Sequence, residues 1–269
     1  MDKYTPTFNW DAKEFYNLLA SCETNTITPY IYKYFKKNNL ILEAGCGMGQ
    51  YVKFLENNGY KAIGIEINKK TVQICNSLEP NLNVLYGDVE NLNFSDNYFD
   101  GILSLGVVEH FIDGPNKPLK EMLRVLKPGG KAIITIPCFN YLRIIKKYTG
   151  LAYLDYYLRF IYHSLKNTPS WLYKNENKAN IQYKYNRWPM KGDFFEYRFK
   201  KTEFENELKK VGFKIIEKVP IENLSGLYFE FGGIFVNMQK PNFIIKSINK
   251  LFSLIPFFHN HQYLCIVTK

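Results

Sequence analysis

The feature that most constrains the fold is a regular alternation of short apolar runs and helical patterns between residues 40 and 138. The apolar runs lack period-two alternation, which is typical of strands buried on both faces of a parallel sheet. Strands that alternate five times with helices predict an open parallel sheet covered by helices on both faces. The expected strands are 40–42, 61–68, 83–88, 99–105 and 131–137, the last after a helix stopped by Pro128, Gly129 and Gly130.

The strand and helix pattern resumes near the C-terminus. Residues 202–213 predict a helix with Thr202 as its N-cap and Gly212 as its stop. A sixth strand at 214–219 and a seventh at 263–269 follow. We therefore expect one domain over 1–269, with a seven-stranded, mostly parallel α/β sheet. Its parts are a helical cap (1–39), a core (40–138), an insert or lid after the fifth strand (139–195) and a C-terminal part (196–269) with a helical insert at 221–262.

Three glycines spaced two apart, Gly45, Gly47 and Gly49, follow the first apolar run in "LILEAGCGMGQY". Glycines at this place allow backbone N–H groups and a helix N-terminus to approach a ligand closely. Ligands of such sheets bind outside the carboxyl ends of the strands. The dinucleotide fingerprint is GxGxxG, whereas this chain reads GxGxG, so the glycines alone do not identify the ligand.

Carboxylates at the next strand ends narrow the ligand class. Glu66 ends the second strand, 17 residues after Gly49, where it can accept both hydroxyls of a ribose. Asp88 ends the third strand, where it can hold an adenine amino group while the Val89 N–H meets a ring nitrogen. With Glu43, these strand ends offer three carboxylates and no phosphate-binding Lys or Arg. This set suits a cationic nucleoside better than a pyrophosphate.

The segments "ILEAGCGMG", "GIEIN", "GDVENLNF", "FDGILSLGVVEHF" and "LKPGGKAIITIP", in that order, resemble class I S-adenosylmethionine-dependent methyltransferases. The resemblance covers 40–138 closely and 196–219 loosely. It implies a Rossmann-like fold with the seventh strand antiparallel between the fifth and sixth, and S-adenosylmethionine as cofactor. It also implies a set of cofactor-binding residues: Glu43, Gly45, Cys46 and Gly47 at the methionine part, Glu66 at the ribose, Ile67, Asp88 and Val89 at the adenine, and Leu105 on the pocket floor.

Each of these residues also has a simpler interpretation. The glycines can serve as plain turn residues, and Glu66 or Asp88 can be a solvated strand end. Cys46 reads as a small side chain that fills a gap. Cys138 in "IPCFN" superficially resembles the nucleophile of cytosine methyltransferases, but it follows the fifth strand rather than the fourth, so we interpret it as coincidence.

His110, in "VVEHF" just past the fourth strand, is the candidate catalytic base. A base is needed if the methyl acceptor is a hydroxyl, and the unperturbed pKa of histidine suits proton transfer near neutrality. Glu109 can orient it, and the alternative is that His110 only packs or bonds to backbone. In the N-terminal cap, Trp10, Phe15 and Tyr16 are candidates to cover the cofactor pocket, with core packing as the alternative.

The net charge of +10 is concentrated in residues 139–192, which contain ten Lys or Arg, two acids and thirteen aromatic residues. We expect a helix over 148–167 and an irregular lid after it. A further helix is expected within 242–258, with an apolar face that suits either a membrane interface or packing against the rest of the protein. That face comprises Phe243, Ile244, Ile248, Leu251 and Ile255.

The sequence thus predicts a methyltransferase enzyme that acts on a small-molecule, sugar or lipid-linked acceptor, at oxygen. The alternatives are an RNA or protein methyltransferase that uses the basic insert, and a non-catalytic cofactor-binding partner subunit. Five scattered cysteines with no CxxC pair indicate neither a metal site nor a disulfide framework. We expect a cytoplasmic protein with peripheral membrane contact as an open alternative; the oligomeric state is not predicted.

Overall fold

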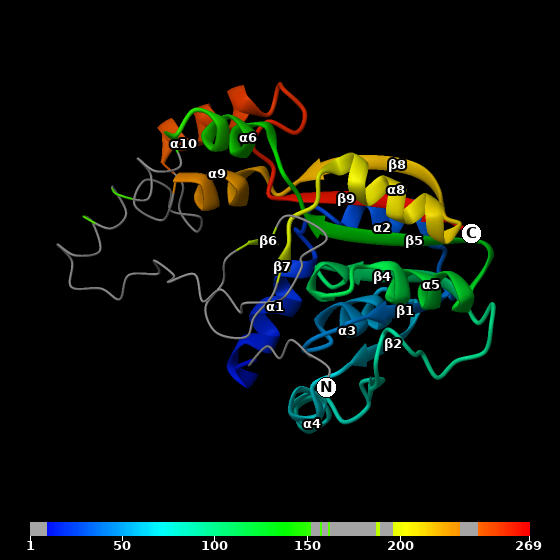
Figure 1. Ribbon diagram of the computed structural model, residues 1–269. Coiled ribbons are helices and arrows are strands. Elements are labelled where there is room, and N and C mark those ends of the chain that lie inside the picture. Colours follow the sequence, from blue (N-terminus) through cyan, green and yellow to red (C-terminus); the bar gives the residue numbers. More distant parts are fainter. Residues whose placement is uncertain (1–9, 152–156, 158–160, 162–186, 189–195, 232–241) are drawn as a thin grey trace. The chain divides into compact units, whose positions relative to one another are not determined.

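The computed structural model describes residues 10–151, 157, 161, 187–188, 196–231 and 242–269 (Figure 1). The chain divides into two compact units. The first comprises 1–136, 202–218 and 264–269, and the second comprises 137–201 and 219–263. None of the helices in the described ranges combines the length and the apolar character that crossing a bilayer requires.

A seven-stranded sheet with the order β3-β2-β1-β4-β5-β9-β8 forms the centre of the fold. The pairs β1–β2, β1–β4, β2–β3 and β4–β5 are all parallel. Its strands are β1 (Leu40–Ala44), β2 (Lys61–Glu66), β3 (Val84–Tyr86), β4 (Phe99–Leu105), β5 (Leu126–Pro137), β8 (Lys214–Ile221) and β9 (Gln262–Thr268). A separate ribbon pairs β6 (Arg187–Trp188) with β7 (Glu196–Tyr197).

The terminal strand β9 lies between β5 and β8, as expected. The Cys138 N–H donates to the His261 carbonyl, and the Thr268 hydroxyl donates to the Gly130 carbonyl. Residue numbers therefore rise along β5 while they fall along β9, so β9 runs antiparallel to β5. The predicted α/β fold with a seven-stranded, mostly parallel sheet is confirmed.

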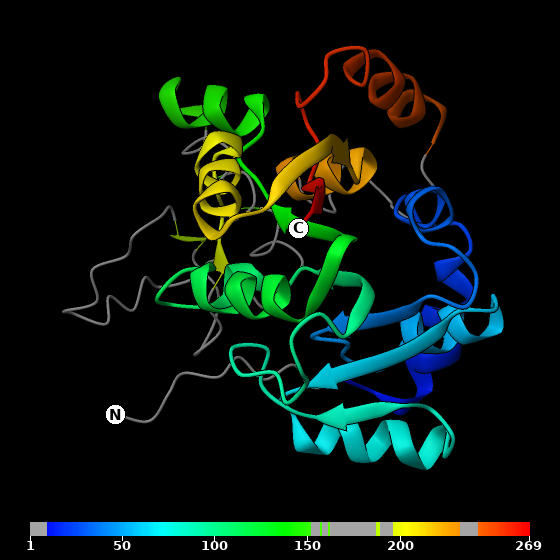
Figure 2. The same cartoon turned by 90° about the vertical axis from the view of Figure 1, so that its right-hand side faces the viewer.

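Helices cover both faces of the sheet. Helices α5 and α8 lie on one face, and α2 and α3 lie on the other (Figures 1 and 2). On the first face, the Asn116 side chain of α5 donates to Glu207 of α8 at 2.6 Å. The helices are α1 (Phe15–Cys22), α2 (Thr28–Tyr34), α3 (Gln50–Asn57), α4 (Lys69–Leu78), α5 (Asn116–Val125), α6 (Tyr141–Tyr148), α8 (Lys201–Val211), α9 (Asn223–Phe231) and α10 (Phe243–Phe252).

The hydrophobic core is densest at the central strands. Ile102 and Leu103 of β4 are fully buried. A Cβ at Gly101 would lie 2.6 Å from the Phe35 ring and 2.8 Å from Ile41, so only glycine permits this close approach of the residue after α2 to the sheet. This packing fixes β1 and β4 against α2 near the amino ends of the two strands.

Two expected boundaries were wrong. Strand β5 begins at Leu126, five residues earlier than predicted, so Pro128, Gly129 and Gly130 lie inside it. The register shifts between Phe99 and Gly101, an irregularity that accommodates such residues within a strand. Helix α8 begins at Lys201, so Thr202 lies in its first turn rather than at its N-cap, whereas Gly212 does follow its last residue.

Most of the expected helix over 148–167 and most of the irregular lid lie outside the described residues. The described part of the insert contains α6 and β6, and β6 pairs with β7 directly after the insert. The expectation of a single domain with the boundaries given above stays a prediction.

Candidate functional site

The three glycines form a loop of left-handed backbone between β1 and α3. Their φ angles are 81° at Gly45, 53° at Gly47 and 73° at Gly49, a region in which a Cβ is strained. Space is restricted as well, because a Cβ at Gly45 would lie 2.6 Å from Val107 and one at Gly47 would lie 3.0 Å from the Trp10 ring. The sequence therefore needs glycine here both for conformation and for close approach.

Glu66 ends β2 directly beside this loop. One carboxylate oxygen accepts the Gly47 N–H at 3.0 Å, and the other accepts the Asn68 N–H at 2.8 Å. Burial raises the pKa of Glu66, and these backbone N–H groups oppose that rise. An ionised carboxylate has about four acceptor positions, so Glu66 retains capacity to accept a ligand hydroxyl beside these backbone N–H groups.

Glu43, in β1, lies beneath the loop and is 2% exposed. Its Oε2 atom has no hydrogen-bond partner among the residues that the structure describes. Burial raises the pKa of Glu43 well above its usual value, the charge of Glu66 adds to the rise, and the Val52 N–H opposes it. A buried carboxylate with an unsatisfied oxygen is a suitable partner for a cationic group.

The ends of β3 and β4 complete the site. The Gly87 N–H donates to the Glu66 carbonyl at 3.0 Å, which ties the Asp88 turn to β2. Asp88 is partly exposed and accepts the Glu90 N–H at 2.8 Å, while Val89 is buried. Ile67 and Leu105 are both partly exposed, at the ends of β2 and β4. The sheet thus brings all nine predicted cofactor residues to the carboxyl ends of four neighbouring strands; their individual roles stay predictions.

The two thiols considered as nucleophiles are buried. Burial raises the pKa of Cys46 well above its usual value, and the charges of Glu43 and Glu66 add to the rise. Burial also raises the pKa of Cys138, although Arg143 opposes it. A buried thiol whose pKa is raised is a poor nucleophile, which favours the interpretation of both as packing residues.

His110 ends the short helix Val108–His110 that follows β4. Its ring is 7% exposed, and Nε2 lies 3.9 Å from a Glu109 carboxylate oxygen. The His110 N–H donates to the Val107 carbonyl at 3.1 Å. Val107 also lies against Gly45, so this bond joins His110 to a residue that contacts the glycine loop. Its role as base stays a prediction.

Of the three aromatic candidates in the N-terminal cap, only Trp10 lies at the loop, over Gly47. Phe15 is fully buried in the core. Tyr16 is more than half exposed, and its hydroxyl donates to Glu79 at 3.4 Å. Val107 lies against Gly45 of the loop. It was not singled out from the sequence, because an apolar residue after a strand carries no distinguishing signal.

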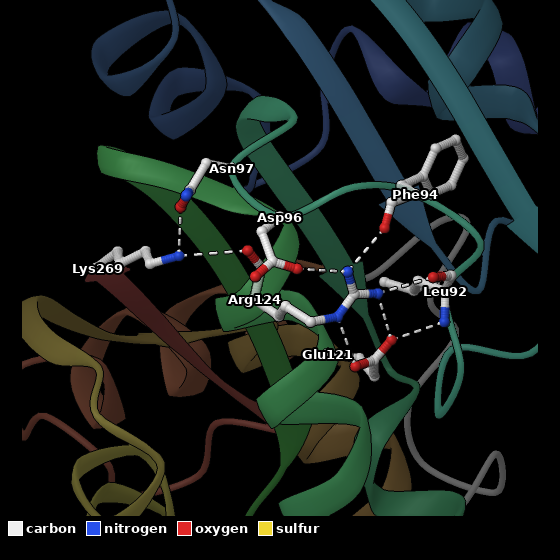
Figure 3. A network of polar contacts seen from close by, with 7 residues as sticks. All are labelled: Leu92, Phe94, Asp96, Asn97, Glu121, Arg124 and Lys269. Carbon is white, nitrogen blue, oxygen red and sulfur yellow. Dashed lines mark hydrogen bonds and ion pairs between the residues drawn. The ribbon is translucent and has the colours of Figure 1, made fainter.

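A polar network around Arg124 of α5 was also not predicted from the sequence (Figure 3). The Arg124 guanidinium donates to both carboxylate oxygens of Glu121 at 2.8 and 2.7 Å. It also donates to the carbonyls of Leu92 and Phe94 and to the Asp96 carboxylate, at 2.7–2.9 Å. This network fixes the loop that leads from the Asp88 turn to β4. The only sequence signal is the three-residue spacing of Glu121 and Arg124, which is common on solvated helices.

Comparison with known proteins finds similarity over part of the chain. The family described as a methyltransferase domain matches residues 42–134. The tRNA (carboxymethyluridine(34)-5-O)-methyltransferase of Arabidopsis thaliana is 33% identical over 100 residues, which are 36% of this chain and 24% of that protein. The phthiotriol/phenolphthiotriol dimycocerosates methyltransferase 1 of Mycobacterium ulcerans is 32% identical over 99 residues, or 35% of this chain and 36% of that protein. The chain therefore spans well under two thirds of either relative.

The whole fold has counterparts among solved structures. A SAM-dependent methyltransferase from Archaeoglobus fulgidus superposes with a TM-score of 0.55 and 19% identity, over 95% of this chain and 94% of that one. At this identity the likeness establishes the fold. The family match over residues 42–134 includes the glycine loop, Glu66 and Asp88.

Proposed function

We propose that the chain is a class I S-adenosylmethionine-dependent methyltransferase that methylates a small-molecule, sugar or lipid-linked acceptor at oxygen. The match to a methyltransferase domain over residues 42–134 and the shared fold support the methyl-transfer part of this proposal. The observation that carries the proposal is the position of His110 beside the cofactor loop.

The residues at the four strand ends fit S-adenosylmethionine. The glycine loop provides a close backbone approach, Glu66 offers acceptor positions for ribose hydroxyls, and the unsatisfied Oε2 of Glu43 suits a cation such as an ammonium group. Asp88 and Val89 supply an acceptor and a donor for the adenine edge. When bound, S-adenosylmethionine supplies a methyl group on a sulfonium whose leaving thioether is neutral. The protein then has to align the acceptor and exclude water.

An oxygen acceptor is supported by His110. A hydroxyl must lose its proton as it is methylated, and a histidine within reach of it can accept that proton. Glu109, whose carboxylate oxygen lies 3.9 Å from Nε2, can orient the ring and stabilise its protonated form. The backbone bond to Val107 fixes the short helix that carries both residues next to the loop.

The choice of a non-nucleic-acid acceptor is supported by the charge of the core. Residues 40–138 carry a net charge of −2, and the basic excess lies in the insert. A phosphate backbone is held by lysines and arginines distributed over a surface. The slightly negative core therefore favours an acceptor that is recognised at a small site over one that is held along a phosphate backbone.

An RNA acceptor is the second candidate, favoured by a specific observation. One relative named above is a tRNA methyltransferase, and residues 139–192 have ten Lys or Arg against two acids. This candidate predicts tight binding to tRNA whose affinity falls steeply with salt. Weak binding with a flat salt response removes it.

The experiment is methyl transfer from radiolabelled S-adenosylmethionine to separate pools of total RNA, lipid extract and polar metabolites. We expect label in the lipid or metabolite pool and none in RNA. Label confined to RNA would overturn the proposed acceptor class. Cofactor binding without transfer to any pool would favour the partner-subunit alternative.

The base role of His110 is tested with His110→Gln, and Glu109→Gln tests separately whether Glu109 orients the ring. We expect His110→Gln to keep cofactor affinity but to lose about a hundredfold or more in kcat, with loss of the acidic limb of the pH profile. A variant that keeps near-full turnover would show that His110 only packs.

A further inference from the structure

Helix α10 has two apolar faces, and the described residues cover one of them. The inner face packs on α9, where Ile245 and Leu227 are buried together and Ile248 and Phe252 close the cluster. Figure 1 shows the two helices as neighbours. Ile248 therefore belongs to the packed face, and the sequence-based grouping that placed it with the remaining apolar residues was wrong.

The outer face is exposed. Five large apolar side chains of α10 and the turn after it are between 53% and 83% exposed. Isolated exposed apolar residues are ordinary, but five of them on one short helix and the turn after it indicate an interaction surface. We call it the α10 surface; it consists of Phe243, Ile244, Leu251, Leu254 and Ile255.

The charged side chains of α10 and of the segment after it have one sign. Lys246 and Lys250 are exposed on the same helix. Residues 242–269 contain Lys269 as their third lysine and no Asp or Glu. An apolar strip edged by lysines complements a surface that is apolar inside and anionic at its boundary.

We propose that α10 binds the interface of an anionic lipid bilayer, with its axis in the membrane plane. Ten residues of helix extend about 15 Å, half the hydrocarbon thickness, so the helix can lie in the interface but cannot cross it. Phe243, Ile244 and Leu251 enter the boundary between headgroups and acyl chains. Lys246 and Lys250 extend back toward the headgroups, as long cationic side chains do at interfaces.

This inference goes beyond methyl transfer and does not depend on it. If the acceptor is lipid-linked, the α10 surface brings the enzyme to the membrane that holds it. If the acceptor is a metabolite, the surface still determines where the enzyme resides. The test therefore uses neither methyl donor nor acceptor, so its failure is distinct from failure of the proposed function.

The experiment is flotation of the full chain with vesicles of phosphatidylcholine alone and of an equal mixture of phosphatidylcholine and phosphatidylglycerol. We expect binding to the mixed vesicles that weakens as salt is raised. The double variant Lys246→Gln/Lys250→Gln should lower the affinity about 30-fold, since each lysine near an anionic surface contributes a factor of about five. The double variant Ile244→Gln/Leu251→Gln should lose binding to both vesicle types.

Ile216→Gln is the matched control, since Ile216 is also exposed but lies on β8. It should bind like the wild type, and all variants should keep their far-ultraviolet circular dichroism because the changed side chains are exposed. Two outcomes overturn the proposal: no binding of the wild type to mixed vesicles, or equal binding of the wild type and Ile244→Gln/Leu251→Gln. A shift from dimer to monomer in that variant, without vesicle binding by either protein, would assign the surface to a second copy of the chain instead.

Discussion

Replacing Glu66 by Gln tests the cofactor site with little change in shape. In the wild type, one carboxylate oxygen accepts the Gly47 N–H at 3.0 Å and the other accepts the Asn68 N–H at 2.8 Å. Glutamine has one carbonyl oxygen, so one of these two backbone donors faces an NH₂ group instead. The change removes one charge-assisted hydrogen bond and a charged acceptor for the ribose.

The expected loss of affinity for S-adenosylmethionine follows from these contacts. A hydrogen bond to a charged group contributes about 1.5–3 kcal/mol, so the loss of the ribose acceptor should weaken S-adenosylmethionine about 10- to 100-fold. The stability of the free enzyme should change less than its affinity for the cofactor. Glu66 is a partly desolvated charge whose pKa is raised by burial, and removal of that charge offsets part of the lost backbone bond. We expect a Tm within about 4 °C of the wild type, or roughly 1 kcal/mol.

The assay is isothermal titration calorimetry with S-adenosylmethionine, alongside a thermal melt of the free protein. Glu79→Gln is the matched control, because Glu79 forms an ion pair with Lys53 at 2.8 Å on the surface and should leave the affinity unchanged. If Glu66→Gln binds the cofactor as tightly as the wild type, the carboxylate does not hold the ribose and the reasoning is refuted.

Three further predictions concern the residues around this site. Gly47→Ala imposes a left-handed backbone cost of about 1–2 kcal/mol and places a Cβ 3.0 Å from Trp10, so calorimetry should show at least tenfold weaker cofactor binding; unchanged binding would contradict the loop assignment. Glu43→Gln should flatten the dependence of Tm on pH. Because burial raises the pKa of Glu43 in the folded protein, the wild type should lose stability as pH rises above the ordinary value of 4.5 and through the folded pKa. An equal slope of Tm against pH in the variant would show that Glu43 does not titrate this way. Arg124→Lys keeps the charge but loses the planar fork, so denaturant unfolding at neutral pH should show a loss of about 1–3 kcal/mol. Arg124 also lowers the pKa of Glu121. The stability that this pair contributes is therefore present above pH 4.5 and lost as pH falls through the lower folded pKa. The difference in unfolding free energy between variant and wild type should close in acid, and a difference that persists there would contradict the linkage.

The core of the fold could be predicted from the sequence because its signals are local. Each buried strand is a short apolar run, and each strand end carries its own glycine or carboxylate, so Gly45, Glu66 and Asp88 could be placed without knowledge of distant contacts. Parallel topology then brings consecutive strand ends to one edge of the sheet. The position of β9 between β5 and β8 came from the family resemblance.

The failures have a common cause, which is contact between distant segments. Pro128 and Gly129 favour a turn locally, but pairing with β4 extends β5 through them. Ile248 and Leu251 are equally apolar, and only the presence of α9 decides which is covered. Arg124 finds its partners 30 and 32 residues away, at Phe94 and Leu92, and spacing along α5 carries no information on that loop.

The most direct test of the account is a calorimetric comparison of ligands for the glycine loop. The GxGxG spacing, Glu66 and the unsatisfied carboxylate of Glu43 predict that S-adenosylmethionine binds at one site per chain and that NAD⁺ produces no binding heat. Binding of NAD⁺ in preference to S-adenosylmethionine would contradict the account, as would the absence of any S-adenosylmethionine binding by the folded wild type.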